Sequence, residues 1–186
     1  MNRYVQADAS TRALIAGPLL LGFAAPANAE VRVGGAPMHA SKDIMDNAAN
    51  SQDHTTLVAA VQAAGLTEML KGPGPFTVFA PVNAAFAALP PSAVDTLLQP
   101  ENKAMLTKVL TLHVVPGKLD AVALMEMMEA GRATLRTLEG ESLTATAPGG
   151  VVTLTDAQGR IAHVTTPNVI QSNGVVHVVD CVLLPE

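Results

Sequence analysis

The sequence predicts an α+β domain, and two features of the chain carry this prediction. Apolar residues recur with helical spacing in the first half, whereas short runs rich in β-branched residues follow one another in the second half. Turns that contain glycine separate these runs, and Asn173-Gly174 is a strong signal for a two-residue hairpin. Because helices and strands are segregated along the chain, an α+β fold is favoured over a parallel α/β sheet.

Residues 1–29 have the pattern of a secretory signal peptide. Arg3 and Arg12 give a weakly basic start, residues 13–25 are apolar, and Ala27-Asn28-Ala29 supplies the small residues of a cleavage site. The apolar run is shorter than the about 20 residues that a spanning helix needs. We therefore expect cleavage after this pattern and a product that is secreted, periplasmic or held at the cell surface. An uncleaved anchor and a disordered leader are the alternatives.

The composition argues against several kinds of partner. The formal net charge is −5 and no basic run is present, so nucleic acid is not an expected partner. Four Phe, one Tyr and no Trp offer little aromatic surface for stacking on sugars or bases. Cys181 is the only cysteine, so no internal disulfide can form. We expect no membrane span after the leader and a fold stabilised by its hydrophobic core.

The first elements after the leader are a lead-in and a helix. Residues 30–42 contain Gly and Pro and lack periodicity, so we expect a flexible lead-in. In residues 51–66 apolar side chains share one helical face, and Gly65 suits the position after the helix end. Asp53 or Thr55 is the expected cap at the start of this helix.

A sharp change from strand to helix is predicted next. Residues 76–79 carry bulky β-formers, and Pro81 ends the strand because proline has no N–H group and disfavours helix at the preceding residue. Asn83 is then expected to cap the following helix by accepting a hydrogen bond from the backbone N–H of Ala85 or Phe86.

The remaining elements follow from the same patterns. In residues 100–117 the chain begins helical, with Met105, Val109 and Leu112 on one stripe, and then turns extended before the turn signal Pro116-Gly117. Further helices are expected at residues 92–99 and 119–131. Strands are expected at residues 133–138, 142–147, 151–155, 160–165 and 174–185.

Three segments of the chain resemble the fasciclin-type domain family. Residues 77–89, TVFAPVNAAFAAL, resemble its first signature, and residues 172–185, SNGVVHVVDCVLLP, resemble its second. Residues 110–119 resemble the segment that carries a Tyr-His pair in the family. The resemblance covers residues 43–186. It implies an α+β fold in which several helices pack around a β-sandwich-like wedge of about seven strands.

The resemblance also implies a function. Fasciclin-type domains occur on secreted and surface proteins and are mostly implicated in adhesion, so a noncatalytic interaction module is expected. Leu112 stands where the family has Tyr, and Val82 and Ala84 replace Thr and an acidic residue that are often found there. Integrin recognition, tied to the Tyr-His pair in some animal relatives, is therefore not carried over. The positions that match the family motif are Thr77, Phe79, Pro81, Asn83, His113, Asn173, Gly174, His177 and Asp180.

The histidines and the cysteine suggest two kinds of chemistry, metal binding and nucleophilic catalysis. His113, His177 and Cys181 could bind zinc, with His163 or a carboxylate as fourth ligand, but none has the close pair spacing of a zinc site. We interpret His113 and His177 as buried residues that hydrogen-bond backbone groups. Cys181 lies in an apolar run that reads as a continuous strand, whereas a nucleophile usually sits on a turn or helix start. We therefore expect neither a metal, a cofactor nor an enzyme activity.

The expected partner is a protein or polysaccharide of the cell surface or matrix, contacted by a monomer. The apolar signature segments are expected to be buried, which leaves loops and helix faces for contact. The candidate surface is the turn with Leu112, His113 and Lys118, together with Met127 in the neighbouring methionine-rich helix. A carrier of a small apolar ligand, such as a pigment or lipid, is the alternative function, and a cysteine-dependent hydrolase is a third.

Overall fold

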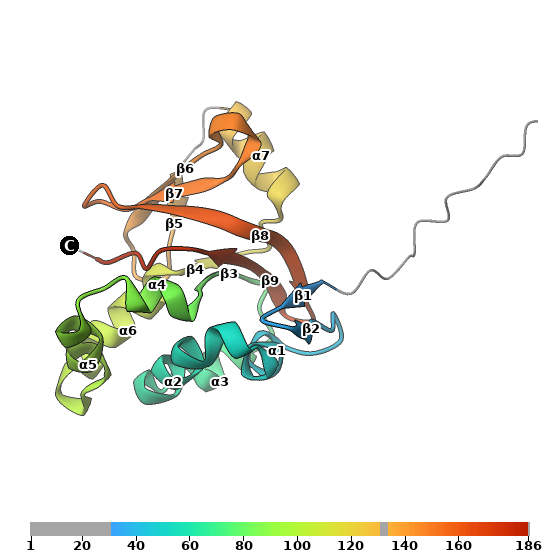
Figure 1. Cartoon of the computed structure of the whole chain (residues 1–186). Coiled ribbons are helices and arrows are strands. Elements are labelled where there is room, and N and C mark those ends of the chain that lie inside the picture. The colour runs from blue at the N-terminus through green and yellow to red at the C-terminus, as the bar shows by residue number, and fades with distance from the viewer. Residues whose placement is uncertain (1–30, 131–133, 186) are drawn as a thin grey trace, which may run out of the picture.

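The computed structural model describes residues 31–130 and 134–185, and it confirms the α+β fold (Figure 1). One sheet has seven strands in the order β4-β3-β9-β8-β7-β6-β5. Its strands are β3 (Phe76–Pro81), β4 (Val114–Pro116), β5 (Thr134–Arg136), β6 (Ser142–Thr146), β7 (Thr153–Thr155), β8 (Ile161–Gln171) and β9 (Gly174–Val179). The helices are α1 (Ile44–Asn50), α2 (Thr55–Ala64), α3 (Thr67–Lys71), α4 (Asn83–Ala87), α5 (Pro91–Leu98), α6 (Lys103–Leu112) and α7 (Ala121–Glu129).

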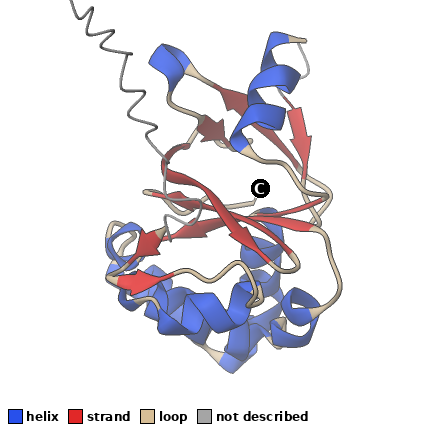
Figure 2. Cartoon of the chain, turned by 90° about the vertical axis from the view of Figure 1, so that its right-hand side faces the viewer, coloured by secondary structure: helices blue, strands red, loops and turns tan. Residues whose placement is uncertain are grey.

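The sheet separates two hydrophobic cores. Helices α1 to α6 lie on one side of the central strands, whereas α7 lies at the other end of the molecule beside β6 (Figures 1 and 2). Along the parallel pair β3 and β9, Val78 and Val178 join the core under the helices. Phe79 and Val179 point the opposite way, into the core that includes α7. Both faces of these strands are therefore covered, which explains their continuous apolar sequence.

The segment expected to be a flexible lead-in is ordered as a hairpin, so that expectation was wrong. Strands β1 (Arg32–Val33) and β2 (Ala36–Pro37) pair antiparallel. Val33 and Met38 are buried in the core under the helices. The two strands are too short to give a periodic apolar pattern in the sequence. Burial of the two apolar side chains stabilises the hairpin against the core.

Two further expectations need correction. Val109 and Leu112 of α6 are buried as expected, but Met105 is 48% exposed. The buried face of α6 includes Leu106 and Leu110, which have helical spacing with Val109. The final strand ends at Val179, and the Cys181–Pro185 segment is irregular rather than a continuation of β9.

No helix in the described ranges is long and apolar enough to cross a membrane. The expected signal peptide, residues 1–29, lies outside the residues that the structure describes.

Candidate functional site

The two signature segments lie side by side at the centre of the sheet. β3 and β9 pair in parallel, with Phe76 opposite Gly174 and Phe79 opposite His177. The rings of Phe79 and His177 stack with their centroids 5.5 Å apart. The fold therefore brings together motif residues that are about 100 positions apart in the sequence, and the question is what their polar side chains do.

His113 holds two backbone segments together. Its Nδ1 lies 2.7 Å from the carbonyl oxygen of Val109, and its Nε2 accepts a hydrogen bond of 3.1 Å from the N–H of Leu183. A carbonyl oxygen can only accept, so the ring must be neutral and carry its proton on Nδ1. Burial lowers the pKa of His113 to about 4, although the bond to Val109 and the charge of Asp156 oppose the shift.

His177 ties the loop before α7 to the sheet. Its Nε2 donates to the carbonyl oxygen of Leu119 over 2.7 Å, while its Nδ1 accepts a long bond of 3.5 Å from the N–H of Asn168. Burial lowers the pKa of His177, whereas the bond to Leu119 and the charge of Asp120 raise it. Both nitrogens of the ring thus have backbone partners, as in His113 but with the opposite tautomer.

Two other polar side chains fix the same loop. The hydroxyl of Thr77 donates to the carbonyl oxygen of Gly117 and accepts from the N–H of Leu119. Asn168, which has a left-handed φ of 58° at an irregularity in β8, accepts from the N–H of Ala121 with its side-chain oxygen. The loop and the first turn of α7 are therefore positioned by hydrogen bonds from β3, β8 and β9.

Asn173 links three segments on the helical side. Its side-chain oxygen accepts from the N–H of Ile44, and its Nδ2 donates to the carbonyl oxygens of Leu70 and Gly72. Because Asn173 is buried, water cannot easily take the place of any of these hydrogen-bond partners if a bond is lost. The hairpin signal predicted that Asn173 would occupy a turn, and the contacts with α1 and α3 add a second role.

Asn83 does not cap its own helix, which corrects the sequence expectation. It is the first residue of α4, and the capping position, occupied by Val82, makes no side-chain bond. Instead, the Asn83 side-chain oxygen accepts from the N–H of Thr56 in the first turn of α2, and its Nδ2 donates to the carbonyl oxygen of Gln52. Asn83 therefore accepts from one of the free N–H groups at the start of α2, that of Thr56, which lies 27 residues earlier in the chain.

We expect Asn83→Ala to lower the free energy of unfolding by roughly 0.5–2 kcal/mol, the usual loss when a helix cap is removed. Asn83→Asp should lie between the parent and the alanine variant. Its carboxylate still accepts from Thr56 and favours the N-terminus of α2, but it cannot donate to Gln52. Urea denaturation measures both changes. Equal losses in the two variants would show that the bond to Thr56 contributes nothing.

His163 pairs with a carboxylate rather than with the thiol of Cys181. His163 lies 3.1 Å from the carboxylate of Asp180, and both side chains are partly exposed. Burial and the nearby charge of Asp180 raise the pKa of the Cys181 thiol, which disfavours the thiolate that a nucleophile needs. Among the described residues, no group of three His, Cys, Asp or Glu side chains is arranged to hold a metal ion.

The structure divides the candidate contact residues into buried and accessible ones. Leu112 is fully buried and His113 is 2% exposed, so the expectation that they contact a partner was wrong. Met127 is half-buried against the core and contributes mainly packing. Lys118 is exposed, as expected.

The sequence analysis named the α7 helix as part of the candidate surface but chose Met127 and missed the exposed residues Val122 and Met125. Val122 is 61% exposed and Met125 is 40% exposed, and both lie close to Lys118 in the sequence. Their spacing of three residues, on a helix that buries Leu124, was the available signal. We call Lys118, Val122 and Met125 the α7 surface.

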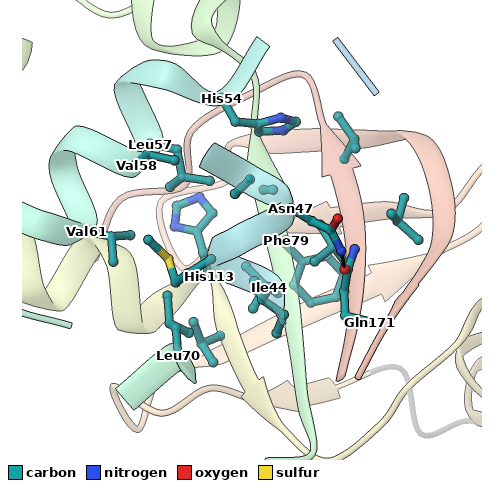
Figure 3. Close-up of a pocket in the computed structure, with 18 of the residues that line it drawn as sticks. Ile44, Asn47, His54, Leu57, Val58, Val61, Leu70, Phe79, His113 and Gln171 are labelled. Atoms are coloured by element: carbon teal, nitrogen blue, oxygen red, sulfur yellow. Dashed lines mark hydrogen bonds between the residues drawn. The ribbon is translucent and has the colours of Figure 1, made fainter. Parts of the chain in front are cut away.

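A small apolar cavity lies between the helical layer and the sheet (Figure 3). Its volume is about 40 Å³, and side chains of β3, β8, β9 and α1 to α3 line it. An engineered apolar cavity that binds benzene has a volume of about 150 Å³, several times larger. A pigment or a whole lipid chain therefore does not fit in this cavity as it stands.

These features define a class of protein. It is an α+β domain in which buried polar side chains hydrogen-bond loops and helix ends to a central sheet. The chain belongs to the fasciclin family, because a model of the fasciclin domain matches residues 52–185. It is 48% identical over 142 residues to Protein sll1483 of Synechocystis sp., covering 76% of this chain and 73% of that one.

More distant relatives share the same domain. The chain is 35% identical to Immunogenic protein MPB70 of Mycobacterium bovis, with 74% of this chain and 66% of that one covered. Among solved structures, a FAS1 domain pair from the insect cell adhesion molecule Fasciclin I matches with a TM-score of 0.70. That match has 19% identity and covers 78% of this chain and 51% of the other, so it supports the fold alone.

Proposed function

We propose that this protein is a noncatalytic adhesion or interaction module that acts outside the cytoplasm. Family membership carries the proposal: the fasciclin domain covers most of the chain, and domains of this family are mostly implicated in adhesion. Another relative, periostin of Homo sapiens, is 26% identical over 147 residues, although the match covers only 16% of that protein.

The chemistry of the buried groups supports this function over catalysis. His113 and His177 use both ring nitrogens to bind backbone groups, so neither has a free position for a substrate. The raised pKa of Cys181 works against a cysteine nucleophile. These polar groups serve the scaffold, and recognition falls to surfaces that the scaffold holds in place.

The α7 surface is our candidate for the contact. Val122 and Met125 are exposed apolar side chains three positions apart on α7, and Lys118 precedes them closely in the sequence. Exposed apolar side chains that gather on one face mark protein contacts, and methionine adjusts readily to different partners. The loop before α7 is held by Thr77, His177 and Asn168, so the surface is presented on a fixed support. A protein or polysaccharide of the cell surface or matrix is the proposed partner.

The contact can be tested with charge substitutions. We expect Val122→Glu and Lys118→Glu to weaken attachment of the purified domain to surface extracts of its own cells. Neither side chain is buried, so each variant should lose less than about 0.5 kcal/mol of stability. Ile161→Glu is the matched control, because Ile161 is 52% exposed at the far end of β8 from Asn168. Full attachment by both α7 variants, or equal loss in the control, would place the contact elsewhere.

Export is the second part of the proposal, and residues 1–29 support it. The intact mass of the protein recovered outside the cytoplasm should correspond to a chain that begins at Glu30. A mass that retains Met1 would contradict cleavage.

A further inference from the structure

The cavity between the helical layer and the sheet has a wall made almost entirely of apolar atoms (Figure 3). Aliphatic side chains of α1, α2, α3, β3 and β9 line it, among them Ile44, Leu57, Leu70, Val78 and Val176. Among the described residues, no lysine, arginine or carboxylate reaches this wall. The cavity is therefore an uncharged apolar space inside the domain.

Four polar side chains belong to the wall, but their polar atoms are turned toward other partners. Asn47 donates a hydrogen bond to the side chain of Gln171. Both ring nitrogens of His113 have backbone partners. The ring of His54 contacts the hydroxyl of Ser51 and a backbone group of β3. The wall therefore presents carbon rather than hydrogen-bonding atoms to a molecule inside the cavity.

Water is a poor occupant of such a cavity. A buried water makes hydrogen bonds to about two to four polar partners, and apolar cavities without them stay dry. The atoms around an empty cavity lack neighbours on one side, so they lose dispersion contacts. A molecule of the right size restores these contacts, and it loses no hydrogen bond to water if it has no polar group.

Size sets the other limit. A single water needs about 10–15 Å³ of volume measured in the same way, so a cavity of about 40 Å³ has room for roughly three or four heavy atoms. We propose that this cavity is a binding site for one short aliphatic hydrocarbon of that size. The site lies on the helical side of the sheet, so it does not depend on the contact proposed for the α7 surface.

The structure also indicates how a hydrocarbon enters. Ala48, Val58 and Met69 line the cavity and are only partly buried, so the entrance lies between α1, α2 and α3. Val33 and Met38, at the N-terminal hairpin, close another part of the wall and precede the residues matched by the family model. The hairpin therefore completes the site with residues from outside the matched domain.

The site can be tested by NMR titration of the purified protein with dissolved methane, ethane, propane and butane. Methyl resonances of Leu57, Val61 and Leu70, which line the cavity, should shift. Affinity should rise about fourfold for each added carbon, as expected for a buried CH₂ group, and the gain should stop at about butane. A steady rise through hexane, or shifts confined to surface residues, would overturn the proposal.

Ethanol tests the apolar character of the site, because it has as many heavy atoms as propane. Its hydroxyl group would be buried without a partner, so ethanol should bind at least about tenfold more weakly than propane. Equal affinities for ethanol and propane would contradict an apolar site.

Variants that fill the cavity locate the binding position. Val58→Phe and Ala48→Leu add bulk from α2 and α1, and each should weaken propane binding at least about tenfold. Ala48→Leu is the smaller change, and leucine is a good helix former, so it serves if the phenylalanine variant does not fold. Val94→Phe on α5 adds the same bulk as Val58→Phe at a partly buried position outside the cavity, and it should bind propane like the parent. Unchanged propane affinity in a folded filling variant would show that the hydrocarbon binds elsewhere.

Discussion

Gly174→Ala should prevent the domain from folding stably, with an expected loss of about 3–5 kcal/mol in the free energy of unfolding. Gly174 begins β9 directly opposite Phe76 of β3. An added Cβ would lie 2.9 Å from the carbonyl carbon of Phe76 and closer still to its oxygen. These are backbone atoms of the central parallel pair, so they cannot move aside without separating the two signature strands.

A second glycine provides the control for this effect. Gly35→Ala has open space around its added Cβ but must adopt a φ of 77°, so it tests backbone strain without a steric clash. Strain of this kind costs about 1–2 kcal/mol. Urea unfolding of both variants measures the difference. If Gly174→Ala is no less stable than Gly35→Ala, the close approach of β3 and β9 is not a constraint.

The second large effect is a loss of stability in mild acid. His113 has a pKa of about 4 in the fold and 6.5 as a free side chain, so the unfolded chain binds more protons between these values. The contribution of His113 to the free energy of unfolding is therefore fully present above about pH 6.5, and it is lost as the pH is lowered toward 4. The difference of 6.5 − 4 = 2.5 corresponds to about 3 kcal/mol. The lowered pKa values of His54 and His177 act in the same direction.

His113→Gln isolates the contribution of this one ring. The variant should be less stable than the parent at pH 7, because glutamine cannot reach both Val109 and Leu183. Its stability should then depend less on pH between 6.5 and 4, since the titrating group is gone. Urea midpoints at several pH values measure both effects. Parallel curves for the two proteins would contradict the assigned role of His113, as would an NMR titration of its ring near pH 6.5.

The local signals in the sequence predicted most of the fold. Residues 133–179 alternate between β-formers and glycine-containing turns, and the predicted strands there coincide with β5, β6, β7, β9 and the first half of β8, because hairpin pairing is decided by nearby residues. The strand predicted at residues 160–165 was too short, since β8 continues to Gln171. Helices α2, α4, α5, α6 and α7 were likewise predicted from local signals, whereas α1 and α3 were not predicted. The hairpin at residues 32–37 was missed, since two-residue strands have no period to detect.

Contacts between distant residues account for the errors at the candidate site. Asn83 has the sequence context of a cap, but its partner is in α2 and only the folded chain brings the two together. Leu112 was assigned to the contact surface because it lies shortly before the turn signal Pro116-Gly117, yet it is the last residue of α6 and is enclosed by the second core.

The central claim is that the signature strands form the support and the α7 surface makes the contact. Photo-crosslinking tests it most directly, with the photoreactive benzoyl-phenylalanine placed at Val122 in one protein and at Ile161 in another. Both positions are exposed, at 61% and 52%, so both variants should fold. On the surface of the protein's own cells, the account predicts a crosslinked partner from position 122 and none from position 161. A crosslinked partner from position 161 alone would contradict it.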